Sequence, residues 1–197
     1  MIREKLRVVF LEDYRVTLAE LLMPAAEISE QISLAGTEAS GTGNMKLMIN
    51  GAVTLGTLDG ANIEMRDAVG DDNILIFGMH ADEVETLYKT GYSPTRIYQG
   101  NQALKDAIGR LNTGIGGISF SDVASSLVGV GNNTADRYMV LADFDAYCRA
   151  HEEALRRYAD KACWNSMSLQ NIAGAGYFSA DRAVTEYADS IWHITRI

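Results

Sequence analysis

The sequence lacks long apolar runs and has few cysteines. No segment approaches the roughly 18 consecutive apolar residues that a membrane helix needs, so we expect no membrane span. The start, Met1 to Arg7, is charged and has no apolar stretch typical of a signal peptide. The only two cysteines, Cys148 and Cys163, have no motif around them, which favours reduced thiols in a cytoplasmic protein.

Positive charge is also in short supply. The 197 residues include 17 basic and 26 acidic side chains, which gives a net charge of −9. Nucleic acids and anionic membranes are bound by basic faces, so we expect neither as a partner. If the protein handles phosphate, most of the positive charge must come from elsewhere.

The first part of the chain alternates short apolar runs with helical patterns, which is typical of βαβ units and a parallel sheet. We expect strands at 7–11, 31–34, 52–57 and 73–77 and helices at 44–50 and 59–68. Thr17 and Glu20 form a capping-box pattern, which predicts a further short helix that ends near Pro24. Asp59 is the expected N-terminal cap of the helix at 59–68.

After residue 82 the strand patterns nearly vanish. Helical patterns follow at 82–90, 101–112, 120–128, 142–161, 163–173 and 180–192. The sequence therefore predicts an α/β fold, with a partial doubly wound region at 1–80 and a mostly helical region at 81–197. A parallel sheet usually has more than the four strands expected here, so we expect its opening strands to lie outside this sequence.

A glycine-rich segment, TEASGTGNMK at 37–46, carries most of the functional signal. Gly41 and Gly43 let backbone amides approach a ligand, and the expected helix directs its first N–H groups at an anion. Lys46 follows about one helical turn later and can point toward a group bound there. The three histidines are far apart and share no metal-ligand spacing, so we expect no metal site.

Three ligands of this segment can be compared. A nucleoside triphosphate requires a lysine directly after the last glycine, where Asn44 stands. A dinucleotide requires a third glycine, where Lys46 stands. Pyridoxal phosphate fits better, because Met45, Leu47 and Met48 favour the neutral amine that condensation of Lys46 with an aldehyde needs. From spacing alone, a glycine-rich turn with an ordinary surface lysine is an equal alternative.

The nine residues at 38–46, EASGTGNMK, resemble the cofactor-lysine signature of the α-glucan phosphorylases, which act on glycogen, starch or maltodextrin. The resemblance continues in VVFLEDYRVTLAE at 8–20, PAAEISEQIS at 24–33, NGAVTLGTLDGANIEM at 50–65, NILIFGM at 73–79 and NIAGAGYFSADRAVTEYADSIWHI at 171–194. It is weakest around 90–140. The chain is thus similar to a C-terminal part of such an enzyme. The resemblance implies the second part of a Rossmann-like lobe of the GT-B type.

The resemblance implies phosphorolysis of the terminal α-1,4 bond of a glucan to glucose 1-phosphate, with pyridoxal phosphate as cofactor. In this family the phosphate group of the cofactor, not its ring, acts with substrate phosphate in proton transfer, so the resemblance makes Lys46 an anchor and assigns no catalytic side chain. The positions that match the family's cofactor site are Lys46, the covalent anchor, with Thr42, Gly43, Tyr14 and Arg15. The positions that match its sugar site are Glu38, Ser40 and Gly41.

Family members are several times longer and place the active site between two lobes. The resemblance therefore implies that α-glucan and inorganic phosphate bind to a cytoplasmic homodimer, whose allosteric control resides outside this chain. We expect the 197 residues alone to be inactive, because a lobe is absent and only Arg15 and Lys46 would supply positive charge. The alternative is a stand-alone binding or regulatory module that retains the cofactor loop.

Overall fold

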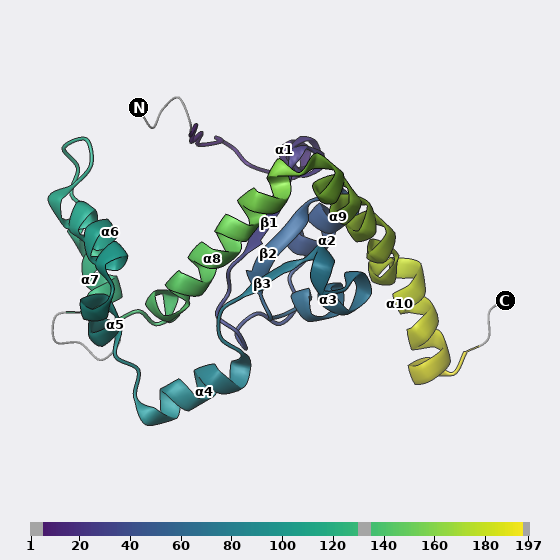
Figure 1. The fold of residues 1–197 in the computed structure, drawn as a ribbon. Helices are drawn as coiled ribbons and strands as arrows, with labels where there is room; N and C mark the ends of the chain where they lie inside the picture. Colours follow the sequence, from purple (N-terminus) through teal and green to yellow (C-terminus); the bar gives the residue numbers. More distant parts are fainter. Residues whose placement is uncertain (1–5, 130–134, 195–197) are drawn as a thin grey trace.

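A computed structural model describes residues 6–129 and 135–194. Three parallel strands lie at its centre, in the order β1-β2-β3 (Figure 1). They are β1 (Ile28–Gln31), β2 (Val53–Thr57) and β3 (Leu75–Phe77). Helix α2 (Gly43–Ile49) follows β1, and α3 (Asn62–Val69) follows β2. The fold is therefore α/β with a Rossmann-like parallel sheet followed by helices, as the sequence predicts.

Helices make up most of the remaining chain. They are α1 (Val16–Leu22), α4 (Ala81–Thr90), α5 (Pro94–Gly100), α6 (Gln102–Thr113), α7 (Ser121–Val128), α8 (Val140–Ala159), α9 (Lys161–Gly174) and α10 (Ala180–Tyr187). Figure 1 shows α8 crossing the sheet, with α5, α6 and α7 gathered beyond its start and α10 at the opposite end. Among the described helices, none has the length and apolar character needed to cross a membrane.

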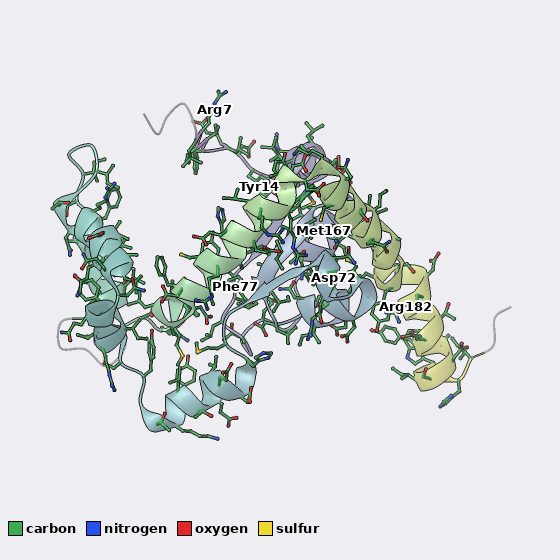
Figure 2. The ribbon with its side chains drawn as sticks, viewed as in Figure 1. Arg7, Tyr14, Asp72, Phe77, Met167 and Arg182 are labelled. Atoms are coloured by element: carbon green, nitrogen blue, oxygen red, sulfur yellow. The ribbon has the colours of Figure 1, made fainter. Side chains whose placement is uncertain are left out.

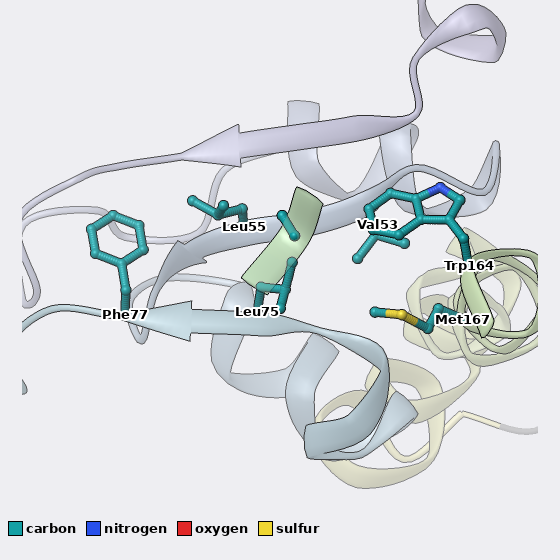
Figure 3. Close-up of a cluster of buried hydrophobic side chains, with 7 residues drawn as sticks. Val53, Leu55, Leu75, Phe77, Trp164 and Met167 are labelled. Carbon is teal, nitrogen blue, oxygen red and sulfur yellow. The ribbon is translucent and has the colours of Figure 1, made fainter. Parts of the chain in front are cut away.

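β2 is buried along its whole length because helices cover both faces of the sheet. On one face Val53 packs with Trp164 and Met167 of α9 (Figure 3). On the other face Met48 of α2 packs with Met65 of α3. A strand buried at every position is typical of a parallel sheet covered on both sides. This burial fixes the position of β2, and with it the turn that follows.

Polar contacts also hold the C-terminal helices on the sheet. The indole N–H of Trp164 donates a hydrogen bond to the carboxylate of Glu27 at 3.0 Å. Arg157 on α8 donates to the carbonyl of Asp72 at 2.7 Å. The core therefore combines residues from 1–80 and from 81–197. The division of the chain at residue 80 stays a prediction.

The strand predicted at 7–11 is wrong. Val8 is 85% exposed and Phe10 is 87% exposed, and the segment has no regular secondary structure. Figure 2 shows Arg7 outside the packed elements. A strand is stable only when a neighbouring strand takes its N–H and C=O groups, and no strand in the described ranges pairs with this segment.

Other boundaries differ less. β1 begins and ends three residues before the strand predicted at 31–34 and shares only Gln31 with it. After Gln31 the chain leaves the sheet and enters a turn in which the amide of Thr37 donates to the carbonyl of Leu34. The capping box of Thr17 and Glu20 is wrong, since α1 begins at Val16 without a side-chain cap. Helix α5 was missed. The strands at 52–57 and 73–77 and the other helices are confirmed to within a few residues.

Helix α9 offers a test of this core. Met167 is 2% exposed, whereas Leu169 on the same helix is 65% exposed. We expect Met167→Ala to lower the free energy of unfolding by about 2–5 kcal/mol, because it leaves a cavity beside the sheet. We expect Leu169→Ala to change it by about 0.5 kcal/mol or less. Urea unfolding followed by circular dichroism measures both, and equal losses would contradict this placement of α9.

Candidate functional site

The loop at 36–42 leaves the carboxyl end of β1 and leads into α2, and the side chain of Asp59 lies against it. One carboxylate oxygen of Asp59 accepts a hydrogen bond from the amide of Gly36 at 2.8 Å. The other accepts from the amide of Glu38 at 2.9 Å and from the hydroxyl of Ser33 at 3.1 Å. Asp59 itself is only 5% exposed, and these three partly buried bonds fix the course of the loop.

Asp59 is therefore not the helix cap that the sequence predicts. α3 begins at Asn62, its N-cap residue is Ala61, and no side chain caps it. The carboxylate instead holds the neighbouring crossover. A signal for this role was present in the sequence. A polar D-G-A-N run directly after an apolar strand lies at the carboxyl edge of a parallel sheet, where ligands bind in such folds.

Two buried asparagines fix the far end of the loop. The side-chain amide of Asn62 donates to the carbonyl of Thr57 at 2.9 Å. The side-chain oxygen of Asn62 accepts from the amide group of Asn44 at 3.0 Å, and Asn44 accepts in turn from the backbone of Met45 at 2.9 Å. The start of α2 is thus tied to the end of β2. Sequence reasoning missed both asparagines.

The middle of the loop lies against the turn at Gly60 and Ala61. The amide of Ala61 donates to the carbonyl of Ser40 at 2.7 Å. Gly60 has a φ of +51°, and a Cβ added there would lie 2.6 Å from the carbonyl oxygen of Ser40. Close approach and backbone conformation therefore both require glycine at this position.

A hollow of about 190 Å³ opens beside the loop. It is lined by Glu30, Gln31, Ile32, Ser33, Glu38, Gly41, Asn44, Asp59 and Asn62. Three of these nine residues are acidic and none is basic. Carboxylate, amide and hydroxyl groups can hydrogen-bond a neutral polyhydroxyl ligand, whereas an anion would meet negative charge.

The structure brings only some of the predicted site residues to this hollow. Glu38 and Gly41 line it. Ser40, Thr42, Gly43 and Lys46 lie on the same loop or in the first half of α2, outside the lining. Tyr14 and Arg15 precede α1, are exposed, and do not line the hollow either. Arg15 forms an exposed ion pair with Asp13 at 3.3 Å.

Lys46 is exposed, and none of the ion pairs in the described part of the chain involves it. Its expected apolar surroundings are only partly present. Met48 packs into the core with Met65, while Met45 and Leu47 are half-buried. The space where a Cβ of Gly43 would lie is open. An accessible amine next to an open backbone fits a covalently attached cofactor. No group of three or more metal-ligating side chains occurs in the described ranges.

Comparisons with known proteins agree on one family. A family model described as carbohydrate phosphorylase matches residues 1–194. The liver form of glycogen phosphorylase from Homo sapiens is 45% identical over 194 residues, which are 98% of this chain and 23% of that protein. The liver form from Bos taurus is 46% identical, and the brain form from Mus musculus is 44% identical, with the same coverage. The chain therefore spans about 23% of the length of these relatives.

Gly60 and Gly70 allow a paired test of the loop geometry. Both have positive φ, +51° and +79°, so an alanine strains the backbone at either position. Only at Gly60 would the methyl group meet backbone atoms, because nothing lies within 4 Å of a Cβ at Gly70. We expect Gly60→Ala to lose about 1–3 kcal/mol more unfolding free energy than Gly70→Ala. Denaturant titration measures the difference, and equal losses would show that Gly60 does not constrain the loop.

Proposed function

This chain belongs to the carbohydrate phosphorylase family, and we propose that it supplies the cofactor loop and part of the sugar site of a longer α-glucan phosphorylase. Such an enzyme phosphorolyses the terminal α-1,4 bond of a glucan and releases glucose 1-phosphate. One observation carries the proposal. The segment at 38–46 that matches the family signature is the loop that Asp59 and Asn62 hold beside the acidic hollow.

On the sugar side, Glu38, Ser40 and Gly41 are proposed to bind the glucosyl residue at the bond that breaks. The carboxylate of Glu38 accepts from sugar hydroxyls, the hydroxyl of Ser40 donates or accepts, and the amide of Gly41 donates. Their contacts with one another are long. The amide of Ser40 lies 3.4 Å from the Glu38 carboxylate, and the Ser40 hydroxyl lies 3.3 Å from the Gly41 carbonyl. These groups can therefore exchange weak local bonds for bonds to a sugar.

On the cofactor side, pyridoxal phosphate is proposed to attach at Lys46. Thr42 and Gly43 would lie beside its phosphate, and Tyr14 and Arg15 would line the rest of its pocket. When bound, it supplies a phosphate group for proton transfer with inorganic phosphate. The residues of this chain hold and orient it. The accessible amine of Lys46 and the open backbone at Gly43 support this role.

The remaining proposals concern charge, substrates and assembly. Arg15 and Lys46 are the only basic residues assigned to the site, so further cations that grip the two phosphates must come from the rest of the enzyme. The proposed substrates are α-glucan and inorganic phosphate, and the proposed form is a cytoplasmic homodimer under allosteric control. The matched relatives are called glycogen phosphorylases, which makes glycogen the first glucan to test.

Covalent attachment at Lys46 can be tested directly. Borohydride reduction of a full-length phosphorylase that carries these residues, followed by peptide mapping, is expected to find the cofactor on Lys46. Lys46→Arg keeps the charge but cannot condense with the aldehyde, so the adduct should vanish. Lys89→Arg, at an exposed position of helix α4, should leave the adduct in place. An adduct on Lys89, Lys105 or Lys161 would contradict the assignment.

The 197 residues alone are expected to release no measurable glucose 1-phosphate from maltoheptaose, even with added cofactor and phosphate. Catalysis requires two phosphates and a sugar to be held in contact, and losing that arrangement removes a proximity effect of roughly 7–11 kcal/mol. Circular dichroism of the same sample serves as the control that the chain is folded. Turnover within about tenfold of an intact enzyme, or about 1.4 kcal/mol in activation free energy, would overturn this prediction.

A further inference from the structure

We propose that Asp59 is a positioning residue. It fixes the position of Glu38 in the sugar site by accepting a hydrogen bond from the backbone amide of Glu38. The inference rests on the proposed function, because it assigns Asp59 a part in sugar binding through Glu38. Asp59 touches no reacting atom in this scheme. Its contribution is the geometry of the loop.

All the side-chain hydrogen bonds that Asp59 forms in the structure go to the crossover between β1 and α2. Gly36 and Glu38 donate their amides at 2.8 and 2.9 Å, and Ser33 donates its hydroxyl at 3.1 Å. The first helical turn of α3 receives nothing from this carboxylate. The side chain of Asp59 therefore stabilises the neighbouring loop rather than the start of α3, the helix that follows it.

All three partners of Asp59 are hydrogen-bond donors, so the side chain at this position must act only as an acceptor. One oxygen of Asp59 faces the amide of Gly36, and the other faces both remaining donors. An asparagine has the same shape, but its NH₂ group would confront at least one of these donors. Rotating the side-chain amide only changes which donor faces the NH₂ group, so the conflict remains unless the loop moves.

The turn at Gly60 supports the loop from the same side. A Cβ there would lie 2.9 Å from Cγ of Glu38 as well as 2.6 Å from the carbonyl oxygen of Ser40. Asp59 thus bonds the amide of Glu38, Ala61 bonds the carbonyl of Ser40, and Gly60 leaves room for the side chain of Glu38 between them. Displacing Asp59 removes the hydrogen bond that fixes the backbone of Glu38 against this support.

The experiment combines Asp59→Asn with Glu38→Ala in a full-length phosphorylase that carries these residues. We expect Asp59→Asn to lower kcat/KM for glucose 1-phosphate about tenfold, the scale of one hydrogen bond to a charged group, while cofactor absorbance is retained. In the Glu38→Ala background we expect no further loss, because a residue that acts through Glu38 has nothing left to position. An equal loss in both backgrounds would overturn the proposal.

Hydrogen exchange of the same variants gives a readout that does not depend on turnover. Asp59→Asn is expected to speed exchange of the Glu38 amide at least about tenfold and to leave the amides of β2 unchanged. The matched control is Thr57→Val. It removes a buried hydroxyl that bonds only the carbonyl of Ser33 at 2.7 Å, and it should leave the Glu38 amide protected.

The outcomes separate the two proposals. An unchanged Glu38 amide in Asp59→Asn would overturn the positioning role and leave the proposed function standing. If Glu38→Ala keeps full activity while Asp59→Asn speeds exchange of the Glu38 amide, Glu38 has no role in sugar binding. The positioning role of Asp59 is then overturned as well. If Asp59→Asn fails to fold, Asp59→Glu keeps the carboxylate but displaces it by one methylene from the amide of Glu38, so it should also speed exchange of that amide. No change in Glu38 exchange would then refute the proposal.

Discussion

The buried carboxylate of Asp59 is the contact on which the arrangement of the site depends. A carboxylate inside a protein is costly unless donors surround it, and the loop after β1 supplies three. Moving the loop away from Asp59 would remove these three partners. The position of Asp59 is itself fixed by β2, because this strand is buried on both faces and ends two residues before Asp59.

The same arrangement separates two kinds of chemistry along a short loop. Glu38 and Gly41 line a hollow that contains carboxylates and no basic side chain, whereas Lys46 lies outside it with an accessible amine. In the function we propose, the sugar binds beside the hollow and the cofactor attaches at Lys46, outside its lining. The net charge of −9 fits the proposal that further cations for the two phosphates come from the rest of a longer enzyme.

Much of the local structure could be predicted from the sequence. The apolar run at 52–57 predicts β2, and Gly51 and Gly70 stand where α2 and α3 give way to the following chain. The signature at 38–46 also indicated the loop that we propose for the site. The strand predicted at 7–11 failed because an apolar pattern indicates a segment suited to burial, while a strand also needs a neighbour for its backbone.

Only the tertiary structure decided how the loop is held. Asp59 bonds Gly36 and Glu38 across 23 and 21 residues, and Asn62 bonds Asn44 across 18. Local rules assigned Asp59 to the helix that follows it, since a helix cap is recognised from neighbouring residues alone. The actual partners belong to the adjacent crossover. They meet Asp59 because β1 and β2 run parallel in register, so that both strands end at the same edge of the sheet.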